Sequence, residues 1–108
     1  QKAAEVFFRR GVKKVIITLG SRGVYLNDQT EEALLSNYDV PVLDTTGAGD
    51  AFNGGLLAGL SQGLSLRNAA VYGNVVANLA VTKLGTAPAM PSIEEIEAFI
   101  RKNNICLS

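Results

Sequence analysis

The chain has 108 residues, of which 47% are hydrophobic and 19% are charged, a composition typical of a folded globular domain and not of a disordered segment. Ten basic and ten acidic side chains give a formal net charge of +0, so the chain lacks the positive charge that binding to DNA or RNA requires. One cysteine, Cys106, and no histidine exclude an internal disulfide and Ser-His or Cys-His nucleophile pairs, and they disfavour a zinc site.

The apolar runs and the first residues bear on the compartment. The longest apolar stretches have only a few residues, far short of the ~20 that a membrane helix needs, and the start QKAAEVFFRRG has no signal-peptide pattern. Together with the single cysteine, this favours a cytoplasmic setting without membrane partners. Because the first residue is Gln1 and not Met, we expect the chain to begin inside a longer protein.

The first part of the chain predicts a helix end followed by strands. Residues 2–10 carry apolar side chains at helical spacing, and Gly11 stands where a left-handed glycine often ends a helix. Residues 15–19 form a continuous, largely β-branched run, which is typical of a strand buried on both faces of a parallel sheet. After the turn GSRG, residues 24–28 predict a short returning strand.

The middle of the chain predicts one more strand. Residues 30–36 form a polar segment, and residues 38–43 predict a strand in which Pro41 marks a sheet edge or a strand end.

The second half of the chain predicts three helices. The first extends from about residue 50 to residue 62, and the second, capped by Ser65, continues to about residue 83. Ser92 and Glu95 form a capping box that opens the last helix. The order of elements predicts an α/β domain with a mixed sheet and packed helices.

A glycine-rich turn before the first of these helices carries the strongest functional signal. It reads DTTGAGDAFNGG from Asp44 to Gly55. Unpaired N–H groups and the positive dipole end of a helix favour an anion such as phosphate at this place. The turn is not a P-loop, since no Gly-Lys-Ser or Gly-Lys-Thr follows, and it is not a dinucleotide fingerprint, since Phe52 stands at the third glycine position.

Asp50 stands where the helix begins, and two roles are open for it. It can cap the helix N-terminus, where Asp is a preferred residue. It can also accept a proton from a hydroxyl that attacks a phosphate. A carboxylate beside a phosphate-binding backbone is otherwise repulsive, which favours the second role.

Three motifs resemble those of the ribokinase family of carbohydrate kinases, also called the PfkB family. DTTGAGDAFNGGLLAGL resembles the family's C-terminal signature, TLGSRGVYL its nucleotide-binding strand and turn, and AVTKLGTAPAMP the segment that closes its nucleotide and cation sites. They occur in the family's order, cover most of residues 15–91, and are most similar to those of ribokinases. The resemblance implies a ribokinase-like three-layer α/β/α fold, whose C-terminal part has a mixed, mostly parallel sheet with packed helices.

The resemblance also implies an activity. The γ-phosphoryl group of ATP, bound with Mg²⁺, would be transferred to the primary hydroxyl of a sugar, with K⁺ as an activator. The product would be D-ribose 5-phosphate if the sugar is D-ribose. Fructokinase-like, 2-keto-3-deoxygluconate-kinase-like and nucleoside-kinase-like activities share the same turn and stay open, as does a module that binds ATP without catalysis.

Residue roles follow from the same resemblance. Asp50 would be the catalytic base and would also bind the sugar, and the amides of Gly47, Ala48 and Gly49 would form an anion hole. The residues implied in ATP binding are Thr18, Leu19, Gly20, Ser21, Arg22, Gly23, Gly49, Asp50 and Asn74. The monovalent cation would be held by oxygens, several of them backbone carbonyls, of Asp44, Thr46, Ala80, Lys83, Gly85 and Ala89.

Several of these residues also have a purely structural interpretation. GSRG alone indicates a simple turn, Asp44 alone a turn-forming residue, and Asn74 alone a satisfied polar contact between helices. Ala89 stands where ribokinases carry a serine, so one side-chain ligand of the cation is absent.

The resemblance covers the C-terminal part of the family's domain. Residues 1–108 are predicted to be the nucleotide-binding and catalytic part of a longer kinase, whose sugar-binding N-terminal part, lid and magnesium motif would precede them. Dimers of this family pair through the lid, so a homodimer is expected only of the longer protein. We expect the 108 residues alone not to phosphorylate sugar.

Overall fold

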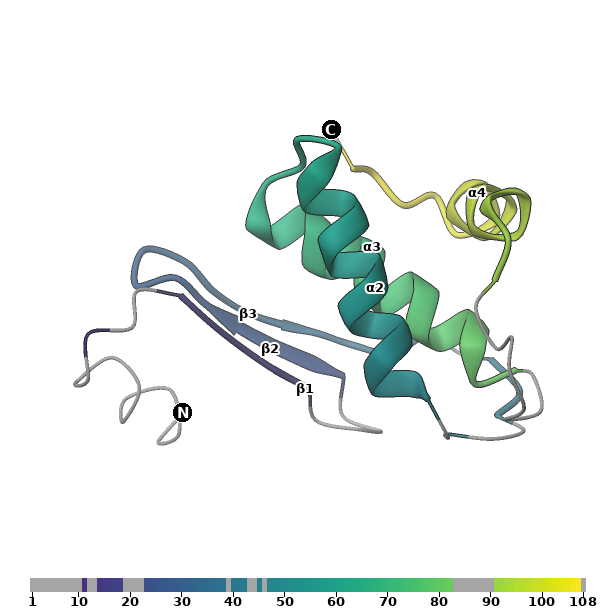
Figure 1. The fold of residues 1–108 in the computed structure, drawn as a ribbon, viewed down its shortest axis with the longest axis horizontal. Helices are drawn as coiled ribbons and strands as arrows, with labels where there is room; N and C mark the ends of the chain where they lie inside the picture. Colours follow the sequence, from purple (N-terminus) through teal and green to yellow (C-terminus); the bar gives the residue numbers. More distant parts are fainter. Residues whose placement is uncertain are drawn as a thin grey trace. The chain divides into compact units, whose positions relative to one another are not determined.

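The computed structural model describes residues 11, 14–18, 23–38, 40–42, 45, 47–82 and 91–107 (Figure 1). The chain divides into two compact units, Gln1–Asn37 and Tyr38–Ser108, and each unit is described by itself. Among the described helices, none combines the length and the apolar character needed to cross a membrane.

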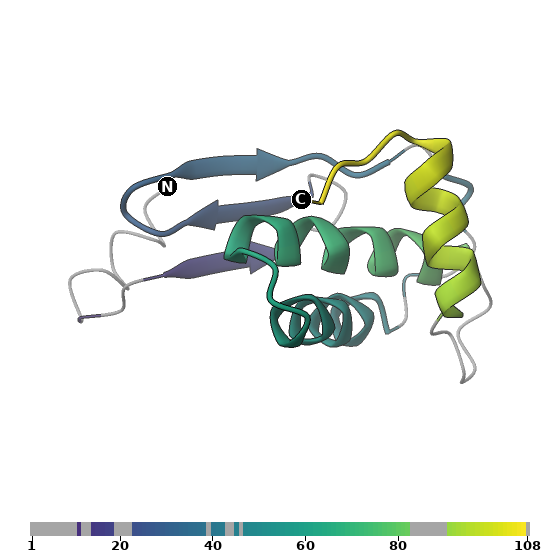
Figure 2. The same cartoon turned by 90° about the horizontal axis from the view of Figure 1, so that it is seen from above.

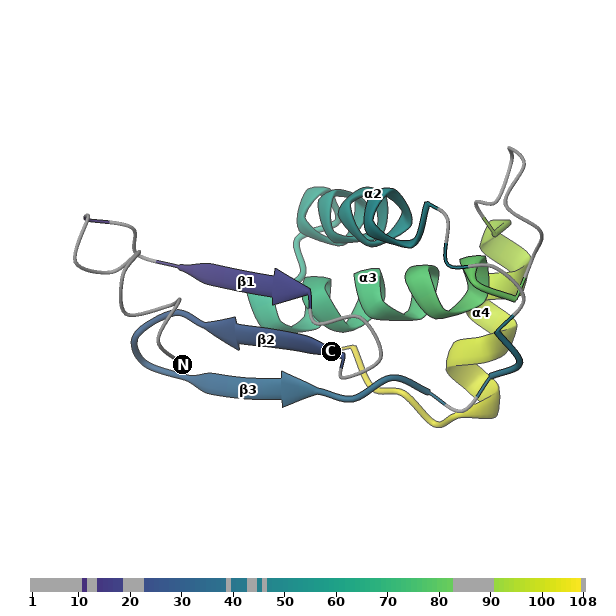
Figure 3. The same ribbon diagram turned by 90° about the horizontal axis from the view of Figure 1, so that it is seen from below.

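The first unit holds a three-stranded antiparallel sheet in the order β1-β2-β3 (Figure 3). The strands are β1 (Val15–Thr18), β2 (Val24–Asn27) and β3 (Glu32–Leu35). In the register of the sheet, Ile16 lies opposite Leu26, which in turn lies opposite Ala33. The strands expected at 15–19 and 24–28 are thus confirmed over their described residues.

The described strands differ in two respects from what the sequence alone indicated. The described strands pair antiparallel, because the short connections between β1, β2 and β3 can join antiparallel neighbours but are too short for a parallel crossover. β3 lies inside residues 30–36, which the sequence marked only as a polar segment and not as a strand. Its side chains alternate between exposed and half-buried. Glu32 and Leu34 face solvent, and none of the four residues of the strand is fully buried.

The strand expected at 38–43 is also wrong for its described residues, 38 and 40–42, which form no strand. The N–H group of Tyr38 donates to a side-chain oxygen, Asn78 Oδ1, at 2.8 Å. This main-chain donor is therefore used outside any strand ladder.

The second unit contains three helices, α2 (Ala48–Ser61), α3 (Leu66–Ala80) and α4 (Ile93–Lys102), and all three expected helices are confirmed. Ser65 Oγ accepts from the N–H of Asn68 at 3.1 Å and caps α3. The capping box of α4 is complete in both directions, between Ser92 and Glu95. The helix expected at 2–10 lies outside the described residues, and Gly11 has the positive φ of +89° that a C-terminal glycine was expected to adopt.

Small residues let α2 pack directly on α3, and α4 runs across α3 near its C-terminal end (Figure 2). A Cβ built on Gly59 of α2 would lie 3.0 Å from the Cα of Ala69, and one built on Gly73 would lie 2.8 Å from the carbonyl oxygen of Phe52. One buried hydrophobic cluster of this unit contains Ala51, Val75, Val76, Ala80 and Ile96. The two helices that follow the glycine-rich turn, α2 and α3, are thus tightly packed on each other.

Candidate active site

The glycine-rich turn enters α2 through a left-handed residue. Gly47 is the N-cap of α2, with φ 80° and ψ 1°, a conformation that side chains disfavour. A Cβ at Gly47 would meet no atom within 4 Å, so the dihedral angle and not crowding selects glycine. The turn is closed by the N–H of Ala48, which donates to Thr45 O at 3.2 Å, and by that of Ala51, which donates to Gly47 O at 2.9 Å.

Asp50 is the third residue of α2 and is exposed. It does not cap the helix, because Gly47 occupies the cap position and no side chain forms a cap hydrogen bond there. The structural alternative considered for Asp50, an N-cap, is therefore wrong. Its carboxylate lies in the first helical turn, open to a reactant and near the positive end of the dipole, where a negative charge is stabilised.

Neither the backbone conformation nor crowding by the described residues requires glycine at position 49. It lies in the first turn of α2, its φ is not positive, and a Cβ there would meet nothing within 4 Å. Glycine inside a helix costs roughly 0.5–1 kcal/mol relative to alanine. Close approach of a ligand to the backbone is a recognised use of glycine, and the open space over Gly49 fits that use.

Gly23 differs from Gly49 in this respect. Its φ is +97°, and a Cβ would lie 2.0 Å from the carbonyl oxygen of Leu35. The path of the sheet itself therefore requires glycine at this position. Thr18, the other described residue of the expected nucleotide segment, is exposed at the end of β1 opposite Val24.

Asn74 is buried, with 3% of its surface exposed. Its Oδ1 and its main-chain oxygen accept hydrogen bonds from Asn78 Nδ2, at 3.1 Å and 2.6 Å. Asn74 thus makes a satisfied polar contact, as one interpretation of the sequence expected, and Asn78 on the same helix is one of its partners. Its place beside adenine stays a prediction.

Ala80 is the last residue of α3. In the last turn, the N–H of Val81 donates to Ala77 O at 3.2 Å, and the hydroxyl of Thr82 donates to Leu79 O at 2.6 Å. The last carbonyls of a helix have no donor within the helix and lie at the negative end of its dipole. The carbonyl oxygen of Ala80 therefore fits a role as a hard ligand of a monovalent cation.

The structure brings Gly47, Ala48, Gly49 and Asp50 together in one turn and places Asn74 and Ala80 on α3. The remaining expected site residues lie outside the described residues: Leu19, Gly20, Ser21, Arg22, Asp44, Thr46, Lys83, Gly85 and Ala89. Over the part of the chain that the structure describes, no group of three or more His, Cys, Asp or Glu side chains is placed to hold a metal ion.

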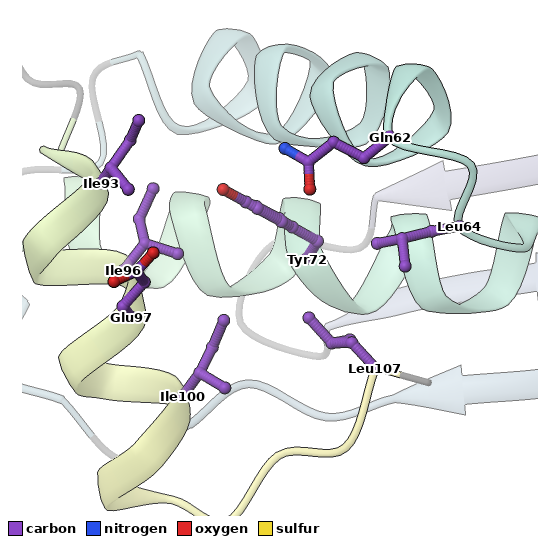
Figure 4. A pocket seen from close by; sticks show the side chains of 8 residues that line it. All are labelled: Gln62, Leu64, Tyr72, Ile93, Ile96, Glu97, Ile100 and Leu107. Carbon is purple, nitrogen blue, oxygen red and sulfur yellow. The ribbon is translucent and has the colours of Figure 1, made fainter.

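A pocket of about 230 Å³ lies between the end of α2, α3, α4 and the C-terminal segment (Figure 4). Tyr72 and Gln62 face it with polar atoms, and Ile93, Ile96 and Ile100 line it from α4. Tyr72 is two residues from Asn74, which places their side chains about 200° apart around α3. The pocket therefore lies on another face of α3 and contains none of the expected site residues.

Comparison with known proteins places the chain in a family. Residues 1–93 match the model of the pfkB family of carbohydrate kinases. The chain is 36% identical over 99 residues to a ribokinase of Haemophilus influenzae, covering 92% of this chain and 32% of that protein. It is 35% identical over 98 residues to a 2-dehydro-3-deoxygluconokinase of Bacillus subtilis, covering 90% of this chain and 30% of that protein.

Solved structures of ribokinases share the fold of this chain. The ribokinase of Thermotoga maritima superposes with a TM-score of 0.89 at 42% identity, over 93% of this chain and 34% of that one. A putative ribokinase II of E. coli, in complex with ATP and Mg²⁺, superposes with a TM-score of 0.85 at 35% identity, over 94% of this chain and 33% of that one.

The chain thus spans about a third of the length of these relatives. The likenesses confirm the ribokinase-like α/β fold that the motifs indicated. The chain belongs to the pfkB family of carbohydrate kinases.

Proposed function

We propose that residues 1–108 are the nucleotide-binding and catalytic part of an ATP-dependent sugar kinase. The observation that carries this proposal is the first turn of α2, where an exposed carboxylate, Asp50, follows a glycine that the fold itself does not require, Gly49. Membership of a carbohydrate kinase family supports the reaction class. We further propose that the protein acts in the cytoplasm.

In this reaction Asp50 accepts the proton of the sugar's primary hydroxyl while the hydroxyl oxygen bonds to the γ-phosphorus of ATP. The bond from that phosphorus to the bridging oxygen breaks, and ADP leaves. When bound with ATP, Mg²⁺ would supply positive charge at the phosphates. The relative that was solved with ATP and Mg²⁺ supports this nucleotide.

The anion hole would be formed by amides of the same turn. The N–H groups of Gly47, Ala48 and Gly49 stand at a helix N-terminus, where they have no acceptor within the helix. Ala48 already donates to Thr45 O over 3.2 Å, so it would share or exchange that bond. The amide of Gly49, under open space, is the main donor in this proposal.

A monovalent cation beside the anion hole would supply positive charge near the transferring group. Its proposed ligands on α3 begin with the carbonyl oxygen of Ala80. The family resemblance adds oxygens of Asp44, Thr46, Lys83, Gly85 and Ala89. The ion would be K⁺.

D-ribose is the proposed sugar, because ribokinases are among the similar proteins by sequence and by structure. A 2-dehydro-3-deoxygluconokinase is similar to nearly the same degree. A panel of sugars and nucleosides, tested with ATP on the natural polypeptide that contains this sequence, would decide between them. D-ribose should give the highest kcat/KM.

The role of Asp50 is tested by Asp50→Asn in the same polypeptide. We expect turnover to fall by roughly 10²–10⁴-fold, the usual contribution of a general base, while the Kd for ATP stays near that of the wild type. Glu94→Gln is a matched control, since Glu94 is also an exposed acid in the first turn of a helix. Unchanged turnover of Asp50→Asn would contradict the proposal, and a panel without any phosphorylated product would favour an ATP-binding module.

A further inference from the structure

Asn78 is a buried polar side chain that the sequence did not mark as part of any site. It lies on α3 with 5% of its surface exposed. Its Oδ1 accepts from the main-chain N–H of Tyr38 at 2.8 Å, across 40 positions of sequence. Its Nδ2 donates to the main-chain oxygen of Asn74 at 2.6 Å and to Asn74 Oδ1 at 3.1 Å.

These partners allow only one orientation of the Asn78 amide. If the amide were turned over, its NH₂ group would meet the N–H of Tyr38 and its oxygen would meet the two oxygens of Asn74. Two donors or two acceptors would then face each other in a buried place, where a lost hydrogen bond is costly. The side chain is therefore a fixed link and not an adaptable one.

Tyr38 is held by its ring as well as by its main chain. The ring meets that of Phe99 on α4 edge to face, with centroids 5.2 Å apart and planes at 82°. Burial also raises the pKa of the Tyr38 hydroxyl. Tyr38 is thus anchored to α3 through Asn78 and to α4 through Phe99.

Tyr38 begins the segment that leads to the glycine-rich turn. The far end of this segment continues into α2, which packs on α3 through contacts such as the one between Gly55 and Gly73. Helix α3 therefore holds the segment at both ends, at Tyr38 by the side chain of Asn78 and after Asp50 by close contact of the helices.

We propose that Asn78 is a positioning residue of the kinase site, which fixes the start of the segment that carries Asp50 and links it to Asn74. This proposal rests on the proposed function. Asn78 does not touch a reactant. It acts by keeping Tyr38 in place, so that the turn of Gly47–Asp50 begins from a fixed point.

The test compares two variants of α3 in the natural polypeptide that contains this sequence. Asn78→Leu keeps the size of the side chain and removes the hydrogen bonds to Tyr38 and Asn74. We expect kcat per folded molecule to fall roughly ten- to a hundredfold, because misplacement of a catalytic group by about 1 Å has effects of that order. The KM for ATP should change much less than kcat.

Val75→Ala is the matched control, since Val75 is fully buried on the same helix and its truncation weakens packing without removing these hydrogen bonds. It should lower the melting temperature and leave kcat per folded molecule near that of the wild type. Folded fractions are measured by circular dichroism at the assay temperature.

A second variant keeps the proposal testable if Asn78→Leu does not fold. Asn78→Asp retains an oxygen for Tyr38 but sets a carboxylate oxygen against the two oxygens of Asn74. Burial and these oxygens would raise the pKa of the introduced carboxyl, and its protonated form can donate again. The ratio of its kcat to that of the wild type at the same pH should therefore rise as the pH is lowered from about 8 to about 6.

Two results would overturn the positioning role. One is a folded Asn78→Leu enzyme that loses no more kcat than Val75→Ala, and the other is a ratio for Asn78→Asp that does not change with pH. Asp50→Asn, measured alongside, separates the two proposals. If Asp50→Asn loses turnover while Asn78→Leu does not, only the role of Asn78 fails. If Asp50→Asn keeps turnover, the proposed base fails.

Discussion

Gly55 of α2 and Gly73 of α3 approach so closely that a Cβ built on Gly55 would lie 2.8 Å from the Cα of Gly73 and 2.9 Å from Cγ2 of Val76. The helices therefore meet backbone to backbone at this point. Asp50 stands about one and a half turns before Gly55 on the same helix, so this contact helps to fix the position of the helix that carries the base.

Gly55→Ala should destabilise the protein. The added methyl group meets main-chain and side-chain atoms that cannot both move away, so we expect the free energy of unfolding to fall by about 1–3 kcal/mol, the usual cost of overpacking. Urea unfolding of the natural polypeptide measures this loss. A variant as stable as the wild type would show that the two helices are able to separate at no cost.

Gly49→Ala should have the opposite effect on stability and a strong effect on turnover. A Cβ at Gly49 meets open space, so we expect a gain of roughly 0.5–1 kcal/mol from the better helix former. If the phosphoryl group approaches this backbone, the same methyl group should lower kcat by roughly ten- to a hundredfold. Wild-type turnover of this stabilised variant would argue against an anion hole at Gly49.

Ser92→Ala should weaken the start of α4. Ser92 Oγ accepts from the N–H of Glu95 at 3.2 Å, and Glu95 Oε1 accepts from the N–H of Ser92 at 3.1 Å. Loss of a serine cap costs about 1 kcal/mol of stability. Ser61→Ala is the control, because Ser61 lies within α2 and its hydroxyl donates to Leu57 O at 2.9 Å, where alanine is well tolerated. Equal stability of the two variants would contradict a capping role.

Asp28 should make the first unit sensitive to acid. The hydrogen bond from the Thr30 hydroxyl, followed by those from the amides of Glu31 and Thr30, holds the pKa of Asp28 below its usual value of 3.8. Because the pKa is lowered by folding, this stabilisation is present above pH ~4 and is lost as the pH falls through the lower value of the folded state.

Asp28→Asn tests this pH dependence. An asparagine oxygen can accept the same hydrogen bonds but does not titrate, so the loss of stability in acid should be smaller in the variant than in the wild type. Asp28→Ala removes the hydrogen bonds at every pH and should be less stable than both throughout. Denaturant unfolding at pH 6 and at pH ~3 gives the comparison. An identical acid dependence of Asp28→Asn and wild type would rule out a contribution from Asp28.

The parts of the fold that were predictable from the sequence depend on residues that are close together in the chain. Ser65 and Ser92 mark helix starts because their hydroxyls accept hydrogen bonds from amides three residues later. Each cap can therefore be recognised from four consecutive residues. β3 escaped prediction because its stability comes from pairing with β2 and not from its own residues. Glu32 and Leu34 are exposed, so the usual alternation of apolar and polar residues is absent.

The candidate site also has a part that was predictable from neighbouring residues and a part that was not. The run Gly47–Asp50 is predictable because the turn, its left-handed glycine and its acid are neighbours in sequence. The absence of a side-chain cap at Asp50 was not predictable, since Asp at a helix start is compatible with both roles. Asn78 carries no signal of its own in the sequence, because its partner is the main chain of a residue 40 positions away.

The contact of Gly55 with Gly73 also limits how the protein can move. With no side chains between them to change rotamer, α2 cannot slide or roll over α3 without a clash of main-chain atoms. The pair should behave as one rigid body during a catalytic cycle. Closure around the substrates would then bring other parts of the kinase towards a stationary Asp50, and the base itself would not travel.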